Sequence, residues 1–223
     1  MDEATLRQLG EMRLFGGIRW QDLPHLLACI GGVERSCARG SFIFLEGEAL
    51  RQVGVIISGT VQMVKEDVWG SRMILTSFAP GDVFGESFVC NDQAASTVSF
   101  LATADCRILF LPFHRLLAAC ARSCQFHHRL IENMAVILAA KNVQLMNKME
   151  LLAKKTIRER ILLWLSQQAQ YQGSTRITSP LGRVELAEYL CVDRSALTRE
   201  LNRMKADGLI DFKRNAFELR VPQ

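Results

Sequence analysis

The stretch RVELAEYLCVDRSALTRELNRMKADGLIDFKRNAFELR, residues 183–220, carries two helical patterns followed by two short strand patterns. Apolar side chains recur on one face of each helical pattern, at Leu186, Ala187 and Leu190 and then at Leu197, Leu201 and Met204. Asp193 stands at the N-cap position of the second helix, and Gly208 follows its last turn. The runs 209–213 and 216–220 indicate strands joined by a turn at Arg214 and Asn215. With a further short strand at 176–178, this order predicts a winged helix-turn-helix.

The second helix of this block has a polar face opposite its apolar one. Four residues near its N-terminus form that face: Arg194, Ser195, Thr198 and Arg199. In a helix-turn-helix such positions contact base edges in the major groove, where arginine can donate two hydrogen bonds to guanine. We expect Lys205, Lys213 and Arg214 to contact phosphates, which positions the block without recognising sequence. The sequence thus predicts a domain over 156–223 that binds double-stranded DNA.

The charge distribution supports this assignment. The net charge of the chain is only +4, but residues 1–125 contain 11 Lys and Arg against 13 Asp and Glu. Residues 126–223 contain 16 Lys and Arg against 10 Asp and Glu. The excess positive charge therefore lies in the half of the chain that is predicted to bind a polyanion.

A long helical stretch precedes the DNA-binding block, because no Gly or Pro occurs between Pro112 and Gly173. Within it, seven positions follow alternating steps of four and three: Ile131, Ala135, Leu138, Asn142, Leu145, Met149 and Leu152. A repeat of 3.5 residues is typical of a coiled coil, and a single Asn in such a seam often fixes its register. We therefore expect residues 126–155 to form a dimerisation helix and a hinge near 153–156. The alternative is a helix that packs on the core of its own domain.

The first 125 residues have a different pattern of predicted secondary structure, with short helices followed by short strands. Short helices are expected at 3–9 and from Trp20 to the Gly31-Gly32 pair. Short β-type runs broken by glycine follow, at 41–45, 53–57, 60–64, 72–78, 97–102 and 107–111. Such spacing predicts a closed or sandwiched all-β unit.

Several classes of protein are excluded by what the sequence lacks. No apolar run approaches the roughly 20 residues of a membrane-spanning helix, and the N-terminal residues show no apolar signal segment. Seven scattered Cys residues favour reduced thiols and a cytoplasmic location. We find no metalloprotease, phosphate-loop or nucleophile-elbow motif, so we do not expect an enzyme.

The segment VIISGTVQMVKEDVWGSRMILTSFAPGDVFGES, residues 55–87, resembles the β-roll of cyclic-nucleotide-binding domains. Together with the long helix and the DRSALTREL segment at 193–201, it makes the chain similar to the CRP/FNR family of bacterial transcription regulators. The resemblance covers about residues 10–220. It implies an α+β chain with a jelly-roll-like β-roll effector domain at 1–125. It also implies a homodimer that binds pseudo-palindromic DNA and alters recruitment of RNA polymerase when a small molecule binds the β-roll.

The resemblance also indicates where an effector would bind. Gly85, Glu86 and Ser87 match the family's phosphate-cradling turn, with Glu86 as the acceptor for ribose hydroxyls, but Ala95 and Ser96 stand where cyclic-nucleotide binders have Arg-Ser. No Lys or Arg occurs between Arg72 and Arg107, so a bound phosphate would lack a cationic partner. Leu145 and Met146 occupy the positions at which cyclic AMP receptors contact the purine with Thr and Ser. We therefore expect an apolar or aromatic effector, or haem, rather than cyclic AMP.

Three alternatives stay open at this point. A cyclic-nucleotide-binding regulatory module would lack residues 180–220. A metal or redox sensor of the same family would use thiolates, yet the cysteines show no C-x-x-C spacing. Cys120, Cys124 and either His127 or His128 lie on one face of a helix and could contribute to a zinc or haem site only with a further ligand. We expect no bound metal and no obligatory cofactor.

Overall fold

A computed structural model describes the chain except for residues 67–68, 70–71, 90–94, 118–124 and 221–223. The described residues form two compact units, 1–139 and 140–223. The long helix α5 (Gln125–Ala153) contributes to both units. The expected division of the chain into three parts, at 125/126 and 155/156, stays a prediction. In the described part of the chain, no helix is long and apolar enough to cross a membrane.

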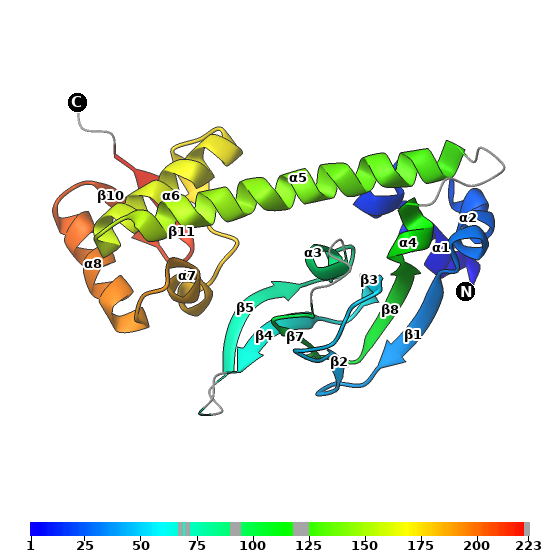
Figure 1. The fold of residues 1–223 in the computed structure, drawn as a ribbon. Coiled ribbons are helices and arrows are strands. Elements are labelled where there is room, and N and C mark those ends of the chain that lie inside the picture. Colours follow the sequence, from blue (N-terminus) through cyan, green and yellow to red (C-terminus); the bar gives the residue numbers. More distant parts are fainter. Residues whose placement is uncertain (67–68, 70–71, 90–94, 118–124, 221–223) are drawn as a thin grey trace. The chain divides into compact units, whose positions relative to one another are not determined.

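The first unit is built around two four-stranded antiparallel sheets (Figure 1). One sheet has the order β1-β8-β3-β6 and contains β1 (Val33–Cys37), β3 (Gln52–Ser58), β6 (Val83–Phe84) and β8 (Cys106–Pro112). The other has the order β2-β7-β4-β5 and contains β2 (Phe42–Phe44), β4 (Val61–Glu66), β5 (Arg72–Phe78) and β7 (Ser99–Ala102). The sandwiched all-β unit that the glycine-punctuated runs predict is therefore confirmed, although β1 and β6 were not among the predicted strands.

The two sheets are packed together through phenylalanine side chains. The Phe84 and Phe100 rings, one from each sheet, have centroids 5.2 Å apart, and Phe44 lies 5.8 Å from Phe110. Gly54 of β3 lies under the Phe84 ring, where a Cβ atom would come within 2.3 Å of Phe84 Cζ. Only glycine fits at that position, because protein cores are close-packed and a larger residue would push the ring off the opposite sheet.

Helices surround the β-sandwich of the first unit. They are α1 (Glu3–Gly10), η1 (Arg13–Phe15), η2 (Trp20–Asp22), α2 (Leu23–Ile30), α3 (Glu86–Val89) and α4 (Phe113–Leu117). Asp2 caps α1 by accepting a hydrogen bond from Thr5 N at 2.8 Å, and Gly31 ends α2 in the left-handed conformation. Asn133 Nδ2 of α5 donates to the carbonyls of Leu14 and Gly16, both at 2.9 Å. The first half of α5 is thereby fastened to the N-terminal segment.

The second unit is a winged helix-turn-helix, as predicted (Figure 1). It contains α6 (Ile157–Gln172), β9 (Arg176–Thr178), α7 (Arg183–Leu190), α8 (Arg194–Ala206), β10 (Ile210–Lys213) and β11 (Ala216–Leu219). The three strands form one antiparallel sheet in the order β10-β11-β9. Leu151 of α5, Trp164 of α6 and Leu197 of α8 are buried in the same core as the predicted apolar faces of α7 and α8.

The helical stretch after Pro112 is interrupted between α5 and α6, near the expected hinge. Thr156 caps α6 by accepting from Glu159 N at 3.2 Å, while Glu159 Oε2 accepts from Thr156 N at 2.9 Å. This reciprocal capping box starts a new helix because Thr156 itself adopts an extended conformation. One helix can therefore end and the next begin here without a Gly or a Pro in the sequence.

Candidate nucleic-acid interface and effector pocket

The start of α8 is held by the predicted N-cap. Asp193 Oδ1 accepts hydrogen bonds from Ser195 N at 2.8 Å, from Ala196 N at 3.0 Å and from Ser195 Oγ at 2.5 Å. The hydrogen bond from the Ser195 hydroxyl, followed by those from the two backbone N–H groups, lowers the pKa of the Asp193 carboxyl. A carboxylate at this position also interacts favourably with the positive end of the helix dipole. The first turn of α8 is thus fixed in position.

The predicted base-contacting face contains two unengaged cations. Arg194 and Arg199 are exposed, and within the described residues neither side chain forms an ion pair or a hydrogen bond. The two hydroxyls are used locally, because Ser195 donates to Asp193 and Thr198 Oγ1 donates to Arg194 O at 2.9 Å. The arginines are therefore the groups of this face that have donors left for an external partner.

Two of the residues predicted to contact phosphates lie at the wing, and the third, Lys205, lies on α8 beside it. Lys213 and Arg214 are exposed at the β10–β11 turn, and Arg214 adopts a left-handed conformation with φ of 53°. Lys205 instead forms an ion pair with Asp211 at 2.5 Å and lies 5.5 Å from the centroid of the Phe212 ring. This pair lowers the pKa of Asp211, since the Lys205 ammonium stabilises the carboxylate. Lys205 thus has a partner on the wing before any phosphate approaches.

Arg183, the first residue of α7, supports the wing and was not among the predicted site residues. Its Nη2 donates to the Arg214 carbonyl at 3.0 Å, and its guanidinium lies 5.2 Å from the Phe212 ring centroid and 5.4 Å from that of Phe217. Burial lowers the pKa of Arg183. The sequence could not indicate this role for Arg183, because the hydrogen bond to the Arg214 carbonyl joins residues 31 positions apart.

Replacing Asp193 by Ala should lower the melting temperature by a few degrees, since it removes the N-cap of α8. The pKa of Asp193 is lowered in the folded state, so its stabilising effect is present above the usual carboxyl pKa of about 4 and is lost as the pH falls. The difference in melting temperature between Asp193→Ala and the wild type should therefore shrink below about pH 4. Thermal unfolding followed by circular dichroism from pH 3 to 7 checks this. A difference that stays constant over the range would contradict the role of the ionised carboxylate.

In the first unit, the predicted effector turn lies between β6 and α3. Gly85 has φ of 83°, and a Cβ atom there would lie 3.2 Å from Leu50 Cδ2, so glycine is required. Glu86 is buried at the start of α3, with 5% of its surface exposed, and Ser87 Oγ donates to Glu86 Oε1 at 3.5 Å. Glu86 and Ser87 therefore follow a glycine turn, and the effector role that the family resemblance implies for them stays a prediction.

The two residues at the positions expected to face a phosphate, Ala95 and Ser96, differ in exposure. Ala95 is exposed, whereas Ser96 is buried and its hydroxyl is bonded to the backbone of Val98, donating to the carbonyl at 2.6 Å and accepting from the N–H at 3.3 Å. A cation does reach the adjoining residue, since Lys65 Nζ of β4 donates to Thr97 O at 3.1 Å and lies 3.4 Å from Glu46 Oε1. This cation comes from a strand outside the stretch between Arg72 and Arg107, which has no Lys or Arg of its own.

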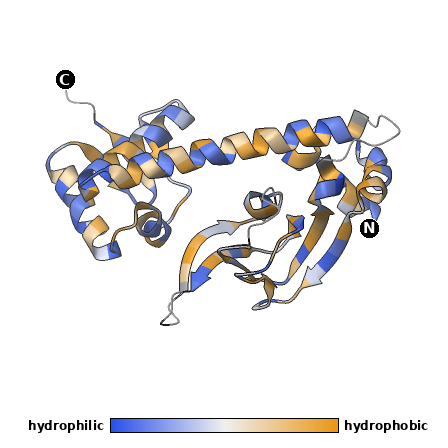
Figure 2. Ribbon diagram, in the orientation of Figure 1, coloured by the Kyte–Doolittle hydropathy of each residue, from blue (hydrophilic) through white to orange (hydrophobic). Residues whose placement is uncertain are grey.

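The predicted positions on α5 are divided between the two units, since residues up to 139 belong to the first and later ones to the second. Leu145 and Met146, predicted to contact an effector, are exposed residues of the second unit. Ile131 and Leu138 of the predicted seam pack partly on the first unit's core, whereas Ala135 and Asn142 are exposed. Leu145, Met149 and Leu152 are 63%, 70% and 41% exposed. Figure 2 shows hydrophobic and hydrophilic bands alternating along α5. The helix therefore packs on its own core at its start and leaves apolar side chains uncovered towards its end.

The candidate metal ligands are only partly described. Cys120 and Cys124 lie outside the described residues. His127 is buried, while the neighbouring His128 is exposed and lies 3.2 Å from Glu132 Oε1. Among the residues that the structure describes, no three His, Cys, Asp or Glu side chains converge in an arrangement that could hold a metal ion. The two histidines thus lie in different environments, one buried and one exposed.

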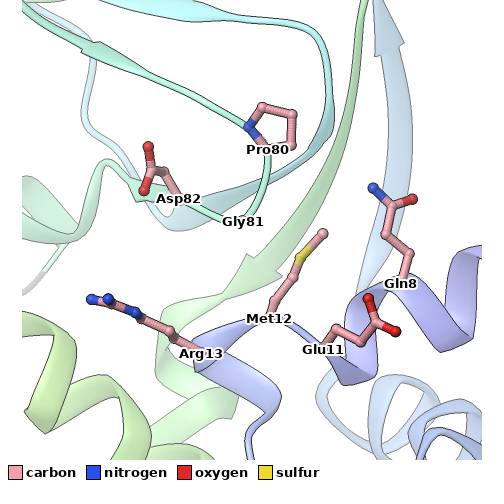
Figure 3. A pocket seen from close by; sticks show the side chains of 7 residues that line it. All are labelled: Gln8, Glu11, Met12, Arg13, Pro80, Gly81 and Asp82. Atoms are coloured by element: carbon pink, nitrogen blue, oxygen red, sulfur yellow. The ribbon is translucent and has the colours of Figure 1, made fainter. Parts of the chain in front are cut away.

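A surface hollow of the first unit lies elsewhere (Figure 3). It is lined by Gln8, Glu11, Met12, Arg13, Pro80, Gly81 and Asp82. These residues come from α1, the segment after it and the β5–β6 turn. The hollow includes none of the residues predicted for the effector.

Taken together, a β-sandwich with the Gly85 turn is followed by a winged helix-turn-helix with a cationic α8, the architecture of a DNA-binding protein with an additional β-sandwich domain. Residues 34–123 match the family model of the cyclic nucleotide-binding domain, and residues 159–223 match that of the Crp-like helix-turn-helix domain. With both domains in this order, the chain belongs to the CRP/FNR family of transcription regulators.

Individual relatives agree with this placement. The chain is 25% identical to the cyclic AMP receptor protein of Thermus thermophilus over 82% of this chain and 81% of that protein. It is 26% identical to the nitrogen fixation regulation protein FixK of Azorhizobium caulinodans over 78% and 69%. Its fold is similar to that of the c-di-GMP responsive global regulator CLP of Xanthomonas campestris, with a TM-score of 0.61, 19% identity and coverage of 92% and 100%.

Proposed function

We propose that this chain is a homodimeric, effector-controlled regulator in which α8 contacts base edges through Arg194 and Arg199. The observation that carries the proposal is the pair of exposed guanidinium groups at the capped start of α8, which form no hydrogen bond or ion pair among the described residues. Arginine at this end of a recognition helix can donate two hydrogen bonds to guanine O6 and N7. Ser195 and Thr198 act as acceptors, because their own donors are engaged.

The wing contacts phosphates in this proposal. Lys213 and Arg214 supply exposed cations at the β10–β11 turn, and Arg183 holds that turn through the Arg214 carbonyl. Lys205 contributes less, since Asp211 already neutralises it. Phosphate contacts add affinity that depends on salt and not on sequence.

The full chain should select a specific DNA sequence from a random library. Because the two recognition helices of a dimer contact half-sites about 34 Å apart, the enriched sequences should contain an inverted repeat spaced by one helical turn. Selection is run on the protein as purified and again with each candidate effector. Recovery of no enriched sequence under any of these conditions would reject the proposal.

We propose further that the effector is an apolar or aromatic molecule. The core next to α3 is rich in phenylalanine, with Phe88 of α3 6.3 Å from Phe100. The Ser96 hydroxyl is already bonded to backbone, and the nearby Lys65 ammonium is paired with Glu46. An anionic phosphate would therefore find no unengaged cation among the described residues of this segment, and anions are costly to bury unpaired.

Cyclic nucleotides are the second candidate, because Glu86 is buried at a glycine turn where the family binds ribose. Thermal-shift measurements distinguish the two: a ligand at one hundred times its Kd stabilises by about 2.7 kcal/mol, which raises Tm by several degrees. We expect phenols to raise Tm and cyclic AMP and cyclic GMP to leave it unchanged. A rise of several degrees with cyclic AMP would overturn the apolar effector. Native mass spectrometry of the purified protein tests in parallel for haem or another tightly bound molecule.

A further inference from the structure

The C-terminal end of α7 is held by cations from outside the helix-turn-helix. The last carbonyls of any helix lack partners within it. Those of Ala187 and Glu188 accept from the backbone N–H groups of Val192 and Cys191, both at 3.0 Å. The next carbonyl, that of Tyr189, accepts from Lys148 Nζ. Two cationic side chains, those of Lys148 and Arg160, thus complete the C-terminus of the helix that precedes the recognition helix.

The Arg160 side chain is the hydrogen-bond donor to the remaining carbonyls of this turn. Its Nη1 lies 3.1 Å from Leu190 O and 3.4 Å from Cys191 O. Cations stabilise the negative end of a helix dipole, and hydrogen bonds from a charged donor are about twice as strong as neutral ones. The turn needs such support, because Cys191 adopts a left-handed conformation with φ of 52°, which non-glycine residues rarely adopt.

The same guanidinium is bonded to the break between α5 and α6. Arg160 Nε donates to Lys154 O at 3.2 Å, and Lys154 is the first residue after α5. Lys148 lies on α5 itself, with its Nζ 4.3 Å from the centroid of the Tyr189 ring. Lys148 thus lies on α5 and Arg160 on α6. The three carbonyls that they contact, those of residues 189–191, lie just before the Asp193 cap of α8.

We infer that Lys148 and Arg160 are positioning residues that set where α8 begins relative to the α5–α6 break. This inference rests on the proposed function, in which α8 contacts DNA bases. Asp193, the cap of α8, follows Cys191 by two residues, so a shift of the Leu190 and Cys191 carbonyls moves the start of α8. A change in backbone conformation at Lys154 reaches the recognition helix through one side chain. The break and the recognition helix are thereby coupled within a single domain.

Lys155 offers a matched control for the charge. It lies in the same break and its side chain is exposed, with no ion pair or hydrogen bond to the rest of the described chain. Lys155→Gln and Arg160→Gln each remove one positive charge from the break. Only Arg160→Gln removes donors from the α7 carbonyls. Any effect of Arg160→Gln that Lys155→Gln does not share is therefore due to the lost hydrogen bonds and not to the lost charge.

Hydrogen–deuterium exchange of the DNA-free protein tests the inference directly. In Arg160→Gln and in Lys148→Gln, the amides of Cys191, Val192, Ser195 and Ala196 should exchange at least tenfold faster than in the wild type, since their hydrogen bonds depend on the turn. Amides in the interior of α8 should be unchanged, and Lys155→Gln should match the wild type throughout. Arg160→Lys, which keeps the charge but cannot bridge break and turn, should give intermediate exchange. Unchanged turn exchange, or a uniform acceleration over the whole domain, would overturn the inference.

DNA binding supplies the second readout. With the sequence recovered by selection, Arg160→Gln should lower affinity for that site at least tenfold and leave affinity for random DNA and its salt dependence unchanged. Lys155→Gln should leave the ratio of the two affinities as in the wild type. An equal loss for both kinds of DNA in Arg160→Gln would contradict a positioning role. If the wild type selects no sequence, the proposed function fails, while the exchange measurement still decides the positioning role.

Discussion

Arg199→Ala is expected to lower affinity of the dimer for the selected DNA site between about thirtyfold and twenty-thousandfold, the largest effect of any single change on the α8 surface. Each well-placed arginine that donates to guanine contributes about 1–3 kcal/mol of discrimination, and a symmetric dimer uses the residue twice. Arg199 is exposed and forms no ion pair or hydrogen bond within the described residues, so its loss leaves no buried group unpaired. The effect should therefore appear in recognition and not in stability.

How the loss of affinity varies among DNA sequences shows whether Arg199 contacts a base or a phosphate. We expect Arg199→Ala to relax specificity at one guanine in each half-site and to change affinity for random DNA little. Arg199→Lys keeps the charge but lacks the planar fork, so it should lose specificity at the same base. Arg203→Ala is the matched control, since Arg203 lies one turn further along α8 and is already paired with Glu200 at 3.6 Å. Fluorescence anisotropy on the site, on its single-base variants and on random DNA measures all three. Equal losses on all DNA sequences would make Arg199 a phosphate contact.

Signals that lie within a few residues of one another predicted the DNA-binding unit well. The strand at 176–178 and the cap at Asp193 have the predicted positions, and α8 begins directly after the cap. Helix capping, apolar periodicity and turn residues act over one or two turns of chain, so they are visible in a linear sequence. The break before α6 also had such a signal, because Thr156 and Glu159 have the spacing of a capping box.

Features that depend on distant residues could not be predicted in this way. The strand β1 has the sequence VERSC, without an apolar run, and exists because it pairs with β8, with Cys37 opposite Cys106. The contacts of Lys65 with Thr97 and of Arg183 with Arg214 likewise join residues about thirty positions apart. Such contacts depend on which strands are neighbours, which is a property of the whole fold. The candidate effector turn was found only through its resemblance to a family.

The uncovered apolar residues at the end of α5 carry the second large prediction. The predicted seam includes Leu145 and Met149, whose side chains are 63% and 70% exposed. Covering a leucine side chain contributes about 1.5–3 kcal/mol, and two-fold symmetry counts each residue twice. Leu138 is a poorer site for a test, since it packs partly on the first unit's core and its replacement would also destabilise that unit.

Leu145→Lys and Met149→Lys should therefore raise the dissociation constant of the dimer at least a hundredfold, because each places two like charges at the centre of an apolar seam. Asn147→Lys is the matched control: it adds the same charge to the same exposed helix, and two residues of helix rotate it about 200° away from either position. Analytical ultracentrifugation should find monomers in the two seam variants and dimers in the control. The seam variants should also lose most affinity for a two-half-site DNA, since a monomer contacts only one half-site. A dimer that persists in both seam variants would move the interface away from this face of α5, and the exposed leucine and methionine would then need another partner.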